Sequence, residues 1–107
     1  MKMRAANGGD VTRYDFEWDI EKARANRVKH GIGFEEAATI FSDPRMLAIY
    51  DDAHSESEDR WITMGASAAS RVLVVCHTYR QGSDGPFAIR IFSARKATRR
   101  ERKQYEE

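Results

Sequence analysis

The sequence predicts an α+β domain in which two N-terminal helices, a four-stranded antiparallel sheet and a C-terminal helix follow one another. Three observations support this class. Apolar residues recur at helical spacing before residue 42, the period changes to two between residues 46 and 92, and a basic C-terminal segment is again helical. Strands this close in sequence pair antiparallel, because parallel neighbours need a long crossover.

The N-terminal part divides into a leader and a helix. Residues 1–13 lack a period and contain two adjacent glycines, so we expect a disordered leader there and a single domain over residues 14–107. Asp19 is a suitable N-cap for a first helix that ends near His30, and Gly31 suits the position just after its last turn.

A second helix is expected from Phe34 to Phe41, because its apolar residues fall on one face, and Ser42-Asp43-Pro44 ends it. The four strands are expected at residues 46–50, 60–64, 71–79 and 87–92. A polar loop separates the first two strands, and Gln81–Pro86 is a hairpin connection. Ser93 is the expected N-cap of the final helix, which starts near Ala94.

Length and composition indicate one folded domain. The chain has 107 residues, of which 33% are charged and 41% hydrophobic, so it can bury one core and lies outside the disordered range. The single cysteine, Cys76, lies in an apolar run, as is typical of a reduced buried thiol. No segment is long and apolar enough to span a bilayer or to act as a signal peptide. We therefore expect a cytoplasmic protein without a membrane partner.

The net charge of +1 conceals a polarised distribution of charge. Between Arg90 and Lys103, seven basic residues stand against the single acid Glu101, whereas acids concentrate in the loop at 51–59. Strand alternation places Arg90 on the other face of the sheet from its apolar neighbours Ile89 and Ile91. A helix starting near Ala94 would align Arg95, Arg99 and Arg102 on one side.

Two interpretations of these arginines remain open. Like charges on one helix face repel each other, and a phosphate would relieve the repulsion because guanidinium groups match its oxygens bidentately. A solvated helix face balanced by nearby acids explains the pattern equally well.

The histidines offer candidates for proton transfer. His77 and Tyr79 end the third strand and could exchange a proton or stack on a base, although a histidine beside valines is more often structural. His54 with Glu56 could bind a metal ion, but a catalytic zinc needs three protein ligands, so we expect no metal site. Lys29 and His30 also suit the negative end of a helix dipole.

Several enzyme classes are excluded by missing motifs. The chain has no nucleophile elbow, no phosphate-binding Walker loop and no dinucleotide-binding glycine turn. The remaining enzyme hypothesis is RNA cleavage without a metal ion or cofactor, in which the 2′-hydroxyl is the nucleophile and the protein supplies a base, an acid and positive charge.

The ordered motifs of the chain resemble the BrnT family of toxins from Tyr14 to Glu107. The motifs are Phe16-Glu17-Trp18-Asp19, Lys29-His30-Gly31-Ile32, Phe34-Glu35-Glu36-Ala37, Asp43-Pro44, His54 with Glu58 and Arg60, Arg90-Ile91-Phe92-Ser93-Ala94-Arg95, and Thr98-Arg99-Arg100-Glu101-Arg102 with Tyr105. The resemblance implies a bacterial type II toxin-antitoxin ribonuclease with a RelE-like fold, which inhibits translation and growth. It also implies a BrnA-type antitoxin, through which alone the complex binds operator DNA.

The resemblance also suggests roles for individual residues. Arg60, Arg90 and Arg95 are expected to stabilise charge and His30 to transfer a proton, so these four are the catalytic candidates. Secondary candidates for RNA binding are Lys29, Tyr79, Arg99 and Arg100. Arg95 would lie at the start of the last helix, beside backbone N–H groups that favour anions. The alternative function is a module whose basic face binds nucleic acid or an acidic protein without cleaving RNA.

Overall fold

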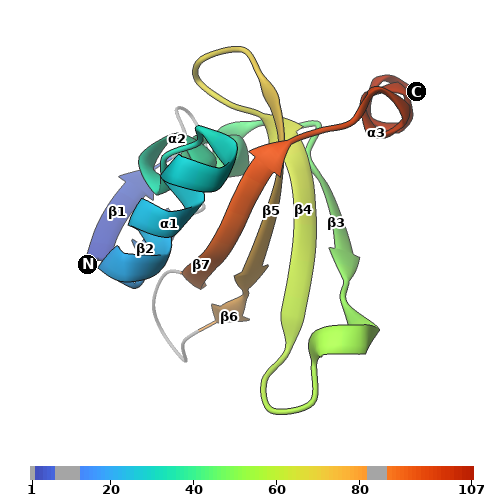
Figure 1. Ribbon diagram of the computed structural model, residues 1–107. Helices are drawn as coiled ribbons and strands as arrows, with labels where there is room; N and C mark the ends of the chain where they lie inside the picture. Colours follow the sequence, from blue (N-terminus) through green and yellow to red (C-terminus); the bar gives the residue numbers. More distant parts are fainter. Residues whose placement is uncertain (1, 7–12, 82–86) are drawn as a thin grey trace.

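One mixed sheet and three α-helices make up the part of the chain that the computed structural model describes, which is residues 2–6, 13–81 and 87–107. Helices α1 and α2 lie together against one side of the sheet, whereas α3 projects from the far end of strand β7 (Figure 1). None of the described helices is long and apolar enough to cross a membrane.

The elements follow the chain in the order β1 (Lys2–Ala6), β2 (Arg13–Glu17), α1 (Ile20–His30), α2 (Phe34–Ala38), the 3-10 turn η1 (Thr39–Ser42), β3 (Leu47–Tyr50), the 3-10 turn η2 (Asp52–His54), β4 (Arg60–Ala66), β5 (Val72–Thr78), β6 (Arg80–Gln81), β7 (Phe87–Lys96) and α3 (Arg99–Glu106). The strand order is β1-β2-β7-β5-β4-β3, and the short β6 also pairs with β7.

The α+β class is confirmed, but the expectation of a purely antiparallel four-stranded sheet is wrong. Strands β3, β4, β5 and β7 do form the expected antiparallel series. Strand β2, however, pairs in parallel with β7. The helices and the other strands between them supply the long crossover that a parallel pair requires. The alternating buried rings of Tyr14 and Phe16 were the signal for this strand.

The expected disordered leader also differs from the structure. Residues 2–6 form β1, which pairs antiparallel with β2, and β2 already begins at Arg13. The expectation is therefore wrong for these residues, while residues 1 and 7–12 lie outside the described part. Residues 82–86 of the expected hairpin connection lie outside it as well.

Helix α1 begins and ends where its capping residues predict. The Asp19 carboxylate accepts a hydrogen bond from the backbone N–H of Glu21 at 3.2 Å. Gly31 has a φ of 71°, which glycine adopts without strain, and its N–H donates to the carbonyl of Arg27 at 2.9 Å. The second predicted helix is present as α2, which continues into η1.

The core lies between the helices and the sheet. Its largest fully buried apolar side chains are Phe16, Ile32, Phe34, Ile40, Leu73, Ile89 and Ile91. The buried amide of Asn26 on α1 donates to the carbonyls of Ile32 and Ala94 at 3.0 and 2.8 Å and accepts from the N–H of Ala94 at 3.1 Å. Asn26 thereby satisfies the backbone of β7 beyond the point where β2 ends.

The last helix starts later than expected. Strand β7 continues through Ser93 to Lys96, and Thr98 is the N-cap of α3. Thr98 and Glu101 form a reciprocal capping box, which satisfies two backbone N–H groups and is a stronger start signal than Ser93 alone. Arg95 therefore lies near the end of a strand, and its expected place at a helix N-terminus is wrong.

Helix α3 is held to the rest of the chain through Asp43. This carboxylate accepts hydrogen bonds from the hydroxyl of Tyr105 and from the backbone N–H of Ala66, the latter at 2.8 Å. Burial raises the pKa of Asp43, but these hydrogen bonds outweigh it and leave the pKa below its usual value.

Candidate functional site

Three cationic side chains surround the ring of Phe92 on β7. The Cζ atoms of Arg60 and Arg90 lie 4.2 and 5.2 Å from the ring centroid, and the Nζ atom of Lys22 lies 5.4 Å from it. We call these four residues the cationic cluster. Each cation is within the range of a cation–π interaction.

Local structure explains why these side chains meet. Arg90 and Phe92 are two residues apart on β7, and strand alternation places both on the face opposite the buried Ile89 and Ile91. Arg60 begins β4. Strand β2 ends before it reaches Phe92, so the first turn of α1 lies beside β7 at that point and brings Lys22 to the ring.

One carboxylate, Glu58, is shared by the two arginines. Nη2 of Arg90 donates to Oε2 of Glu58 at 2.5 Å, and Nη2 of Arg60 lies 3.9 Å from Oε1. A hollow beside the cluster is lined by Glu17, Glu58, Thr78, Arg80, Ala88 and Arg90. The cluster and the hollow together contain four cations and two carboxylates, so the site carries excess positive charge. The cations are Lys22, Arg60, Arg80 and Arg90, and the carboxylates are Glu17 and Glu58.

The two guanidinium groups are partly withdrawn from water. Their Nε atoms are buried and have no hydrogen-bond partner among the described residues. An unsatisfied buried donor costs about 1–3 kcal/mol, and the contacts with the Phe92 ring offset part of this cost. The ring and Glu58 therefore hold both guanidinium groups in place before any ligand arrives.

Thr78 fixes the backbone at the same place. Its hydroxyl accepts a hydrogen bond from the backbone N–H of Arg90 at 3.0 Å, next to an irregularity in the β5–β7 pairing between Cys76 and His77. Such bulges reorient side chains locally. The side chain of Arg90 is thereby set by a defined backbone position.

Arg95 lies in a different environment at the other end of β7. Its Nη1 and Nη2 donate to the two carboxylate oxygens of Glu101 at 2.8 and 2.9 Å. These hydrogen bonds lower the pKa of Glu101 to about 2 and raise that of Arg95. The charge of Arg95 is therefore neutralised within the protein. Arg99 and Arg100 are exposed on α3.

The other predicted residues lie outside the cationic cluster. Lys29 and His30 are in the last turn of α1. His30 is eight residues from Lys22, or about 12 Å along the helix axis. Tyr79 follows β5, and its ring stacks on Phe87 at a centroid distance of 4.8 Å. The structure thus brings together Arg60 and Arg90, but not His30 or Arg95.

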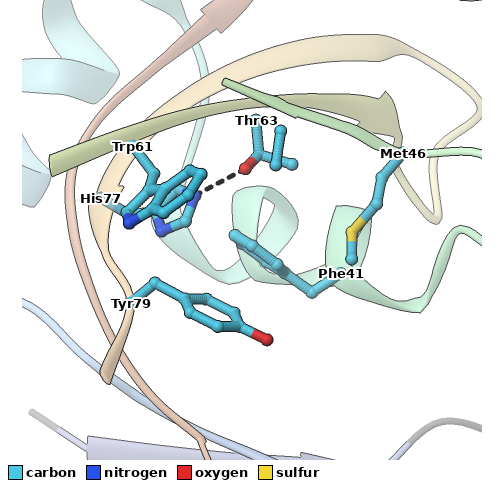
Figure 2. A pocket seen from close by; sticks show the side chains of 7 residues that line it. Phe41, Met46, Trp61, Thr63, His77 and Tyr79 are labelled. Atoms are coloured by element: carbon cyan, nitrogen blue, oxygen red, sulfur yellow. Dashed lines mark hydrogen bonds between the residues drawn. The ribbon is translucent and has the colours of Figure 1, made fainter. Parts of the chain in front are cut away.

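His77 is buried and fully hydrogen-bonded. Its Nδ1 lies 2.7 Å from the carbonyl of Thr78, so it donates there, and Nε2 accepts from the hydroxyl of Thr63 at 2.7 Å (Figure 2). Burial lowers the pKa of His77 to about 4, although the bond to Thr78 opposes this shift. His77 is therefore neutral at pH 7.

Sequence reasoning did not assign a role to Lys22, Glu58, Thr78 or Phe92. The sequence contains a signal for two of them: Phe92 lies two residues after Arg90 and therefore on the same face of the strand, and Glu58 lies two residues before Arg60. Lys22 had none, because only tertiary packing brings α1 to Phe92. Within the described ranges, no three His, Cys, Asp or Glu side chains form a group that could hold a metal ion.

Comparison with known proteins identifies the relatives of this fold. Residues 18–101 match the family model described as the ribonuclease toxin BrnT of type II toxin-antitoxin systems. The structure is similar to the crystal structure of the ribonuclease toxin BrnT of Brucella abortus, with a TM-score of 0.54 and 22% sequence identity. The match covers 78% of this chain and 96% of that one. No curated protein sequence matches the chain.

Proposed function

Because the chain belongs to the BrnT family of ribonuclease toxins of type II toxin-antitoxin systems, we propose that Glu58, Arg60 and Arg90 carry out its endoribonuclease reaction and do so without a metal ion. The observation that supports this proposal most strongly is the shared carboxylate. Glu58 is bonded to one guanidinium group and lies close to the other, and both are held over Phe92. A candidate base and two phosphate-binding cations therefore occupy one place.

The proposed reaction is an internal transesterification of RNA. The scissile phosphate binds between the guanidinium groups, and the Glu58 carboxylate accepts the proton of the 2′-hydroxyl. The 2′-oxygen then forms a bond to phosphorus while the bond to the 5′-oxygen breaks, and that oxygen takes a proton from water. Arg60 and Arg90 stabilise the negative charge that develops on the phosphate oxygens.

Other basic and aromatic residues would contact RNA farther from the scissile phosphate. The exposed Arg99 and Arg100 of α3 suit contacts with the RNA backbone, and Tyr79 suits stacking on a base. Lys29 and His30 end α1 and remain proposals for contact with RNA or for proton transfer. Arg95 reaches RNA only if it exchanges Glu101 for a phosphate.

The family implies an antitoxin as the protein partner. We propose that this antitoxin is of the BrnA type, that operator DNA is bound only through it, and that the free toxin inhibits translation and growth in the cytoplasm. A likeness of the fold to the RelE toxins also remains part of this proposal.

Cleavage of RNA in the presence of EDTA tests the proposed reaction. The purified chain should produce fragments that end in 2′,3′-cyclic phosphate. Glu58→Gln is nearly isosteric but a much weaker base, so it should reduce the cleavage rate by about 10²–10⁴-fold. Intact RNA at high protein concentration would instead favour a binding module, and cleavage that requires a divalent ion would contradict the metal-free reaction.

A further inference from the structure

Strand β3 is an open edge of the sheet. It is the last strand in the order, and all four of its residues are exposed, with Leu47 at 42% and Ile49 at 66%. In Figure 1 no described strand lies beyond it on the side away from β4, and helix α3 lies near the start of β3. The strand contains no lysine, proline or bulge, which are the usual means of protecting an edge from pairing with another chain.

The backbone of β3 is oriented for pairing with a further strand. The N–H of Asp51 donates to the carbonyl of Arg60 at 2.8 Å, at the end of the β3–β4 ladder. In an antiparallel ladder, hydrogen-bonded pairs alternate with non-bonded pairs. Ala48 and Tyr50 therefore direct their N–H and carbonyl groups away from β4, toward the open side.

An apolar pocket lies beside this edge on the helix-covered face. It has a volume of about 140 Å³ and is lined by Phe41, Met46, Ala48, Trp61, Thr63, His77 and Tyr79. Figure 2 shows the labelled side chains facing a common space, with Thr63 and His77 bonded to each other. Their mutual hydrogen bond uses the hydroxyl proton of Thr63 and Nε2 of His77, so neither group has a donor left for a ligand in the pocket. A cavity of ~150 Å³ with apolar walls accepts a group the size of benzene.

We infer that an extended segment of the antitoxin pairs with β3 and inserts one large apolar side chain into this pocket. A strand added at the usual spacing of about 4.8 Å would place alternate side chains beside Ala48 and the pocket, and the others beside Leu47 and Ile49. Pairing thus covers the exposed apolar side chains of β3 and fills the pocket. The inference rests on the proposed function for the existence of this partner.

A second copy of the chain does not fit the same place. On the pocket side its β3 would offer only Ala48 and Tyr50. Ala48 is too small to fill the pocket. The ring of Tyr50 already packs on Trp61 at 5.3 Å, and its hydroxyl donates to Asp59 at 2.9 Å.

The position of the added antitoxin strand also explains how the antitoxin would inhibit RNA cleavage. Arg60 begins β4, the neighbour of β3, so an added strand would lie about 10 Å from it, which is two strand spacings. The exposed acids Asp52 and Asp59 flank the end of β3. The antitoxin segment should therefore carry a basic residue there, and its bulk would hinder the approach of RNA to Arg60.

Binding to the antitoxin from the same locus, co-expressed with the full chain, tests the inference. In hydrogen exchange, the amides of Ala48 and Tyr50 should exchange quickly in the free chain and slowly in the complex. Ala48→Pro removes one of these N–H groups without breaking the β3–β4 ladder, so it should weaken binding by about tenfold or more. Ala48→Lys keeps the backbone donors but places a charge at the pocket, and should weaken binding similarly.

The control is Val28→Ser, which removes the apolar side chain that is 89% exposed on α1 and should leave binding unchanged. Both Ala48 variants should still cleave RNA. Wild-type affinity in both variants, or unprotected β3 amides in the complex, would overturn the inference. The inference would also be overturned if the β3 amides of the free chain became protected from exchange as the concentration of the chain rises, because that result would assign β3 to a second copy. If the antitoxin protects the β3 amides but the free chain does not cleave RNA, the proposed reaction is refuted and the inference about β3 stands.

Discussion

The two ends of β7 carry arginines in contrasting environments. Near its start, Arg90 shares one carboxylate with Arg60 and lies over an aromatic ring that a third cation also contacts. Near its end, Arg95 has a carboxylate of its own, Glu101, which it binds with both Nη atoms. The first end retains positive charge, whereas the second is neutralised.

This difference shows why the number of basic residues is a poor guide to the site. Most of the basic residues between Arg90 and Lys103 lie at the neutralised end or on the exposed helix α3. Phosphate binding depends on which cations lack a carboxylate of their own and are held rigidly. By that criterion we place the proposed reaction at the start of β7.

Among substitutions on β7 and α3, Arg90→Ala should have the largest effect. It removes a cation that would stabilise the transition state, so we expect the RNA cleavage rate to fall by about 10²–10³-fold. Arg95→Ala is the matched control at the other end of β7 and should lower the rate only a few-fold. The two variants are compared by cleavage rates measured on a defined RNA substrate under single-turnover conditions. A larger loss for Arg95→Ala than for Arg90→Ala would place the reaction at the end of β7 instead of at its start.

Phe92→Leu should have an intermediate effect. Leucine keeps apolar bulk on β7 but removes the ring that orients both guanidinium groups, and a cation–π contact contributes ~0.5–2 kcal/mol. The cleavage rate should therefore fall by roughly tenfold while the protein stays folded. Phe87→Leu removes a ring elsewhere on β7 and serves as the control; because Phe87 stacks on Tyr79, the two variants are compared at saturating RNA. Equal rates for Phe92→Leu and the wild type would mean that the ring does not orient the arginines.

Glu101→Gln should weaken the attachment of α3 at the end of β7. Glutamine can keep the capping box, but it loses the ion pair with Arg95, so α3 should lose roughly 0.5–1 kcal/mol of local stability. Since the folded pKa of Glu101 is lowered from 4.5 to about 2, its contribution is complete above pH 4.5 and disappears as the pH falls toward 2. NMR signals of α3 followed between pH 6 and 2 should show a larger acid-dependent loss in the wild type than in the variant, because the hydrogen bond between Asp43 and Tyr105 is present in both.

Local signals in the sequence predicted much of the fold. Asp19 and Gly31 set the ends of α1, and period-two runs located β3, β4, β5 and β7. The parallel pairing of β2 with β7 could not be predicted, because it joins segments from opposite ends of the chain. The capping box of Thr98 and Glu101 marks the start of α3 in the sequence, whereas Ser93, the expected cap, lies within β7.

The candidate site was predictable only in part. The family resemblance indicates Arg60 and Arg90, but their proximity depends on the pairing of β4 and β7 with β5. The contact of Lys22 with Phe92 depends on where β2 ends and α1 begins. No spacing along the chain contains that information.

The double variant Arg99→Ala/Arg100→Ala should have the smallest effect. Both side chains are exposed on α3 and lie beyond the neutralised end of β7, so they would contact only the RNA backbone. We expect RNA affinity to fall a few-fold, the salt dependence of binding to become shallower, and the rate at saturating RNA to remain unchanged. A large loss of that rate would place α3 at the scissile phosphate, and the contrast between the two ends of β7 would then no longer locate the reaction.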